Sequence, residues 1–176
     1  MKLNTFSGLA AAAAIGAFAF APIAAHASST GTLSATATIS SSATLTLGDT
    51  AGTASTLTFA GVGGQNVSPS EGVITVTAQV TTDSANSSTK ITVLGEDLSG
   101  VTSGNTIPVA CLSYTNTVQS GGGTWHGRTL SAEAQTVATL PGSGTYTGDQ
   151  SYNLAIPANA NADTYTGNVT YAIVGF

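Results

Sequence analysis

Apolar and hydroxyl-bearing residues alternate over 15 residues near the beginning of the chain, from Leu33 to Leu47. A two-residue period places one set of side chains on each face of a β-strand, and threonine favours strands. At about 3.3 Å per residue the segment would extend about 50 Å, well beyond an ordinary strand. We therefore predict either a break at 40–42 or a strand that extends beyond its own domain. The apolar side of this segment consists of Leu33, Ala35, Ala37, Ile39, Ala43, Leu45 and Leu47.

Shorter stretches with the same period follow, separated by connectors rich in Gly, Ser, Asn and Asp. No stretch has a convincing helical period, although a helical turn at 132–138 stays open as an alternative to a strand. Short alternating strands with turn residues between them predict an all-β, antiparallel, immunoglobulin-like sandwich of about eight strands. The predicted strands after residue 47 are 56–60, 73–81, 90–94, 107–113, 136–140, 151–156 and 164–174.

Residues 1–27 are typical of a secretory signal peptide. Lys2 supplies a positive charge, an uncharged run follows from Leu9 to Ala21, and Ala25-His26-Ala27 fits the pattern of a cleavage site. The run is shorter than the roughly 20 residues that cross a bilayer, which disfavours a membrane anchor. We expect export from a bacterium to the periplasm, the cell surface or the medium. The mature chain, 28–176, is expected to form one domain without a transmembrane helix.

Charge is scarce, since 6% of the residues are charged and the formal net charge is −5. Lys90 and Arg128 are the only cations after residue 27, so no nucleic-acid partner is expected. Cys111 is the only cysteine, which excludes an internal disulfide. Cys111 lies an even number of residues from Ile107 and Val109, so an alternating strand would place all three on the same face. We therefore expect Cys111 to point into the core. A disulfide between two chains is the alternative.

Few residues suit catalysis or metal binding. His126 is the only histidine after residue 27, and no Gly-x-Ser-x-Gly elbow marks a nucleophile, so we do not expect an enzyme. One His and one Cys cannot form a closed zinc site, and no metal or cofactor is predicted. Aromatic side chains bind sugars when they are exposed. Trp125, His126 and Tyr114 are therefore candidate ligand contacts of a secreted carbohydrate-binding or cell-wall-binding module.

The C-terminal segment from Leu154 to Tyr171 contains an apolar strand, a Pro/Ala/Asn turn and the sequence Asp163-Thr164-Tyr165-Thr166-Gly167 before a last strand. This order resembles the ending of pilin-like bacterial β-sandwiches, among them chaperone–usher pilins and spore-coat-U-like domains. The segment 107–114 is similar to an internal strand of WxL-type surface domains. The chain departs from both patterns, because it has neither a pair of cysteines nor a Trp-x-Leu sequence.

The resemblance implies a pilin-like fold and a structural subunit of a cell-surface filament or extracellular matrix. Its partners would be copies of itself or a related surface protein, with or without a dedicated chaperone. In such filaments the N-terminal strand of one subunit completes the sheet of the next. The segment 33–47 suits this role, because backbone bonds give strength and alternate side chains fill a groove. Alternatively, the same residues form ordinary strands within one chain.

Overall fold

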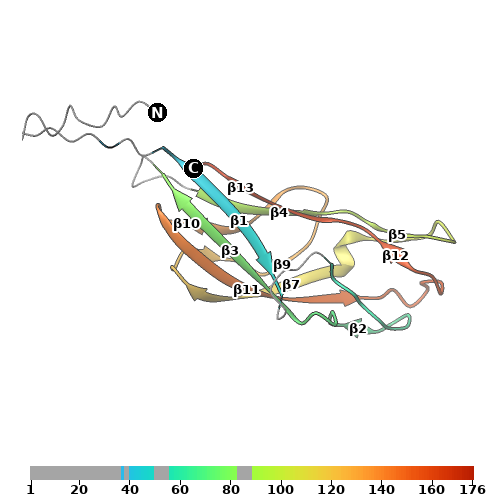
Figure 1. Cartoon of the computed structure of the whole chain (residues 1–176). Coiled ribbons are helices and arrows are strands. Elements are labelled where there is room, and N and C mark those ends of the chain that lie inside the picture. The colour runs from blue at the N-terminus through green and yellow to red at the C-terminus, as the bar shows by residue number, and fades with distance from the viewer. Residues whose placement is uncertain (1–36, 38–39, 50–55, 83–88) are drawn as a thin grey trace, which may run out of the picture. The chain divides into compact units, whose positions relative to one another are not determined.

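The computed structural model describes residues 37, 40–49, 56–82 and 89–176. These residues form an all-β antiparallel sandwich, which confirms the predicted fold class (Figure 1). Two sheets pack face to face, and a small third sheet lies towards one end. Seven of the strands have six or more residues, close to the predicted number, and the others are short.

The larger sheet has the strand order β1-β3-β11-β7-β9, with β2 added beside β11. All of these neighbours are antiparallel. Its strands are β1 (Ser42–Gly48), β2 (Asn66–Val67), β3 (Val73–Thr81), β7 (Leu112–Ser120), β9 (Arg128–Thr129) and β11 (Gly144–Ala155).

The facing sheet has the order β13-β4-β10-β8, and the third sheet has the order β12-β5-β6. Strands β1 and β13 are thus edge strands, and they lie near each other on one side of the sandwich. The strands are β4 (Thr89–Gly95), β5 (Leu98–Gly100), β6 (Thr106–Ile107), β8 (Thr124–Trp125), β10 (Gln135–Leu140), β12 (Tyr165–Thr166) and β13 (Val169–Val174).

Alternation along the strands builds the core between the two sheets. In β3 every second residue from Ile74 to Val80 is buried, and the residues between them face outwards. The sequence pattern predicted this strand with the bounds that the structure shows, because one face of it is covered along its whole length. The largest fully buried side chains are Ile91, Leu130, Leu140, Gln150, Val76, Val93, Val137 and Thr89.

Only the second half of the long alternating segment lies in a described strand. Its second half forms β1, which pairs with β3 of the same chain and places Ala43, Leu45 and Leu47 on the half-buried side. Ala37, Ser40 and Ser41 are exposed and lie outside any strand. Leu33, Ala35 and Ile39 lie outside the described residues, as does the predicted signal peptide. The predicted break at 40–42 therefore agrees with the point where β1 begins.

The predicted strand at 107–113 is wrong. Pro108 precedes a 3₁₀ turn over Val109–Cys111, and β7 begins only at Leu112. The turn reverses which alternate side chains face the core, so that Leu112 is buried while Cys111 is only half-buried. The expectation that the thiol points into the core is corrected accordingly, although Cys111 still packs against the core.

Other boundaries also differ from the prediction. The predicted strand 164–174 is divided into β12 and β13, which belong to different sheets. Residues 56–60 are extended but belong to no sheet, and 132–138 form bends followed by β10 rather than a helical turn. Strand β11 begins at Gly144, seven residues before the predicted start at 151. Residues 145–150, rich in Gly and Thr, were assigned to no predicted strand. Cross-strand partners on both sides hold them in the sheet.

Candidate functional site

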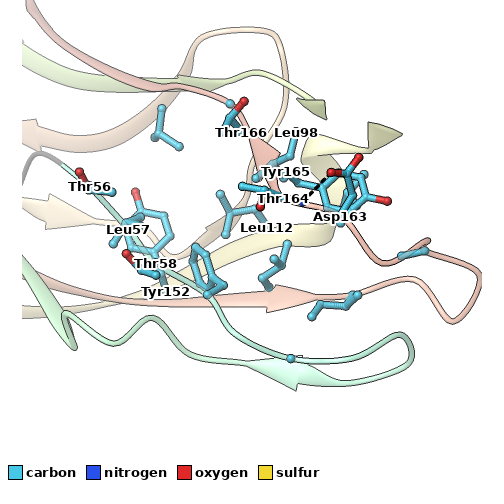
Figure 2. A pocket seen from close by; sticks show the side chains of 18 of the residues that line it. Thr56, Leu57, Thr58, Leu98, Leu112, Tyr152, Asp163, Thr164, Tyr165 and Thr166 are labelled. Carbon is cyan, nitrogen blue, oxygen red and sulfur yellow. Dashed lines mark hydrogen bonds between the residues drawn. The ribbon is translucent and has the colours of Figure 1, made fainter. Parts of the chain in front are cut away.

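A cleft of about 790 Å³ opens at the end of the sandwich where β1 ends and β3 begins. Two extended segments form its walls, 56–59 on one side and 160–169 on the other (Figure 2). Tyr152 and Leu112 lie deeper between these walls. The cleft exists because the third sheet and the segment 56–65 diverge beyond the end of the main core.

The cleft walls carry apolar side chains that the fold leaves only partly covered. Leu57 and Phe59 are half-buried while their neighbours Thr56 and Thr58 are exposed, which is strand-like alternation. On the other wall Val169 and Tyr171 of β13 are half-buried as well. The partly buried apolar residues of the lining are Leu47, Leu57, Phe59, Leu98, Ile156, Ala160, Tyr165, Val169 and Tyr171.

Backbone edges on both walls are open to a further strand. Among the described residues, β13 pairs only with β4 and β12 pairs only with β5, so each has one free edge. Opposite them, the hydrogen bonds of segment 56–60 to other described residues are all at Thr58, whose amide donates to Glu71 and whose carbonyl accepts from Ser70. An extended chain between these walls could therefore bond to unpaired backbone groups.

A buried polar cluster adjoins the cleft, and Tyr152 and Tyr171 are the members of it that line the cleft. Tyr171 reaches from β13 across to β11, where its hydroxyl donates to the Gln150 side-chain oxygen and contacts the Tyr152 hydroxyl. The Tyr114 ring lies against the Tyr152 ring, with centroids 5.4 Å apart. Burial raises the pKa of Tyr152 and Tyr171 well above the ordinary value. It raises the pKa of Tyr114 to about 12, although the Arg128 charge lowers it.

Charge is almost missing from the described lining, where Asp163 is the only carboxylate and no Lys or Arg is present. Its carboxylate accepts hydrogen bonds from the Ser103 hydroxyl and from the amides of Ser103, Thr102 and Thr164. These bonds, the Ser103 hydroxyl first, hold the pKa of Asp163 at about 2. They tie the start of β12 to the turn after β5 and so fix one wall of the cleft.

We expect Asp163→Ala to lower the melting temperature and to loosen the turn at 101–105. The pKa of Asp163 is about 2 in the folded chain, whereas its ordinary value is 3.8. The ionised carboxylate therefore stabilises the fold fully above pH 3.8, and this stabilisation is lost as the pH falls through about 2. Thermal melts of wild type and variant across this pH range measure the difference. Glu133→Ala removes an exposed acid as the control. A deficit in the Asp163 variant that stays constant down to the lowest pH would contradict the assignment.

The three candidate ligand contacts, Tyr114, Trp125 and His126, lie outside the lining of the cleft. Tyr114 is 3% exposed and belongs to the core. The half-buried Trp125 indole packs on Gly148, and its Nε1 donates to the Gly122 carbonyl. His126 is half-buried, and its backbone bonds to Val137 and to the Asn116 side chain. These placements argue against sugar binding at Tyr114 and Trp125.

Sequence reasoning did not select the residues of the polar cluster beside the cleft. Tyr152 and Tyr171 lie in predicted strands, where their parity marks them only as inward-facing. Gln150 carries a clearer signal, because it shares its parity with Tyr152 and Leu154 and is therefore a polar residue on an apolar face. The prediction missed it because the strand was expected to begin one residue later.

The comparisons with known proteins identify no family. No protein-family model and no curated protein matches the chain. Among solved structures, it is similar at a TM-score of 0.38 and 11% identity to a family 123 glycoside hydrolase from Clostridium perfringens, which was studied for glycolipid glycan hydrolysis. That match covers 65% of this chain and 19% of the hydrolase, so this chain spans less than a fifth of its length. A likeness at this level carries no argument about function.

Among the described residues, neither a membrane-spanning helix nor a metal site is found. In the part of the chain that the structure describes, no helix has the length and apolar character needed to cross a membrane. Over the same residues, no group of three or more His, Cys, Asp or Glu side chains is arranged to hold a metal ion.

Proposed function

We propose that the chain is an exported structural subunit of a cell-surface filament or extracellular matrix, in which the N-terminal segment of one copy adds a strand to the next. One observation carries the proposal: the cleft lies at the opposite end of the sandwich from the start of β1. Strand β1 begins at Ser42 beside Thr81, whereas Leu47 and Ile74, near the other ends of β1 and β3, line the cleft. A donor at one end and an acceptor at the other produce head-to-tail contacts, which build open fibres.

The acceptor supplies what strand addition needs. The free edges of β12 and β13 offer backbone groups, and the apolar walls offer space for alternate side chains. The side chains of Val169, Tyr171 and Ile173 all point inwards but stay only half-buried. An added strand would complete their burial, at about 25 cal/mol for each Å² of apolar surface removed from water.

The donor segment matches the cleft in charge, and it is long. Residues 28–41 contain no charged side chain, as suits a cleft whose only carboxylate is already bonded within the chain. Fully extended, these residues would reach about 46 Å. A segment of that length can extend well beyond its own domain to a neighbouring subunit.

The test compares the mature chain, 28–176, with a variant that lacks 28–41, by negative-stain electron microscopy and light scattering. We expect regular fibres from the mature chain and none from the deletion variant. The deletion variant keeps its cleft but donates no strand. Added in small amounts to the mature chain, it should therefore cap growing ends and shorten the fibres.

A matched pair of substitutions separates strand addition from simple stickiness. Leu33→Asp places a charge on the apolar side of the segment and is expected to abolish assembly, whereas Ser34→Asp places it on the opposite side and should be tolerated. A synthetic peptide of 28–41 should bind the mature chain and inhibit its assembly. Fibres that form equally well without 28–41, or a mature chain that stays monomeric and ignores the peptide, would refute the proposed function.

A further inference from the structure

The exposed apolar side chains are concentrated at the two ends of the sandwich. Among the described residues, three large ones are exposed at the cleft end, two at the opposite end and one between them, which are in this order Val62, Val73, Val101, Val174, Phe176 and Val118. Val62 belongs to the cleft lining, and the Val101 amide donates to the carbonyl of Thr164, which also lines the cleft. Val174, by contrast, ends β13 at the opposite end (Figure 1), whereas Val169 at the other end of this strand lines the cleft. Both ends therefore present apolar surface to the solvent.

The same two ends carry charges of opposite sign. Lys90, the only lysine after residue 27, is exposed near the start of β4, where it pairs with Val174. Glu96 and Asp97 are exposed directly after the other end of β4, and their carbonyls lie close to Gly167, which lines the cleft. Among the described residues, the end with Lys90 is therefore cationic and the cleft end is acidic.

Lys90 and Glu96 lie on the same outer side of their sheet, at opposite ends of one strand. Burial alternates from Thr89 to Glu96, and the even-numbered side chains face outwards. At about 3.3 Å per residue the two charged residues are about 20 Å apart, so they cannot pair within one chain. When sandwiches follow one another end to end, however, Lys90 of one copy meets the acidic end of the next.

Each end thus forms one surface with apolar and charged parts. The lysine surface consists of Lys90, Val174 and Phe176, and the acidic surface consists of Val62, Val101, Glu96 and Asp97. We propose that the lysine surface of one copy docks against the acidic surface of the next copy. Apolar patches with charges beside them match the composition of protein interfaces.

The inference rests on the proposed function, because it takes the partner to be the next subunit of a head-to-tail fibre. It goes further, since strand addition by itself joins the sandwiches only through the inserted segment, whereas this contact makes the sandwiches touch. Because two acidic surfaces repel each other, the contact also favours head-to-tail over head-to-head arrangements and gives the fibre a direction.

Carbodiimide cross-linking of the mature chain at assembling concentration, followed by mass spectrometry, tests the contact directly. The reagent joins an amine to a carboxylate that touches it, and Lys90 is the only lysine of 28–176. We expect links from Lys90 to Glu96 or Asp97 in dimers and larger species and none within a chain, because about 20 Å separate Lys90 from Glu96 there. Lys90→Arg keeps the charge but offers no amine to the reagent, so it should still assemble and lose these links.

Charge reversal tests the attraction between the two surfaces. Lys90→Glu places a carboxylate against the acidic surface, so fibre elongation should slow about tenfold at low ionic strength. The deficit should shrink near 1 M salt, where the screening length falls to about 3 Å. Adding Glu96→Lys exchanges the two charges and should restore most of the rate. Ala172→Glu, at an exposed position of β13 between the two ends, is the control and should change the rate by less than about twofold. Thermal melts check that each variant folds.

The outcomes separate the two proposals. If fibres grow equally fast with Lys90→Glu and Lys90 gives no link to Glu96 or Asp97, the docking of the two ends is wrong and strand addition stands. If Lys90 links only to carboxylates away from the cleft end, the assigned acidic surface is wrong. If the mature chain stays monomeric and gives no link between copies, the docking and the proposed function fail together.

Discussion

Raising the pH above 10.0, the ordinary pKa of tyrosine, is expected to unfold the domain within a few pH units. Tyr114, Tyr152 and Tyr171 lie together between the sheets, and burial is the largest cause of the raised pKa of each. The fold therefore holds them neutral at a pH where the unfolded chain would ionise them.

The sign follows from proton linkage. The stabilising effect of a group with a raised folded pKa is fully present below the unfolded pKa and is lost as the pH rises through the folded one. Each tyrosine that stays neutral in the fold lowers the free energy of unfolding by about 1.4 kcal/mol for every pH unit above 10.0. Three such groups together reach about 4 kcal/mol per unit, and a typical domain has only about 5–15 kcal/mol in total.

Urea melts at a series of alkaline pH values measure this slope, and tyrosinate absorbance reports when the buried hydroxyls ionise. Tyr152→Phe removes one of the three groups, so the slope should become shallower by about a third, whatever the variant does to stability at neutral pH. Tyr165→Phe, at the half-exposed cleft wall, controls for the loss of a hydroxyl as such. Tyrosines that ionise in the folded chain without loss of stability would contradict the buried cluster.

The sandwich could be predicted because alternation and burial agree along most strands. In β3, and in most of β4 and β10, the side-chain pattern alone determines which face is covered, and their predicted bounds lie within a residue or two of the structure. The prediction failed where a local feature overrides the pattern. Pro108 starts a turn that reverses the parity of Cys111, and the Gly- and Thr-rich start of β11 looks like a connector until its neighbours are known.

The cleft could not be predicted, because it depends on how far two sheets diverge at one end. No period in the sequence reports the distance between the segment 56–60 and β12. The same limit applies to Trp125, because no sequence pattern indicates the residue on which its ring packs. In the structure its ring meets Gly148 from the opposite sheet, a contact between residues 23 positions apart in the chain.

That contact gives the second large effect that we expect. Gly148 lies in the middle of β11 with its missing side chain towards the core, and the Trp125 ring occupies the vacant space. A Cβ at position 148 would lie 2.6 Å from two carbons of the indole ring. Because Trp125 is also held by its bond to the Gly122 carbonyl, the ring cannot move without losing that bond. Gly148→Ala should therefore destabilise the domain by about 2–3 kcal/mol, as overpacking does.

The pair can be tested by a double-mutant cycle in urea. Trp125→Ala alone should cost about 2–4 kcal/mol through the lost packing of a half-buried ring. In that background the clash is gone, and Gly148→Ala should become neutral or stabilising by about 0.5–1 kcal/mol, since glycine weakens a strand interior. Ser151→Ala, at an exposed position of the same strand, should be nearly silent in both backgrounds. Additive effects of the two substitutions would show that Trp125 does not pack on Gly148, and would restore its ring as a candidate for ligand binding.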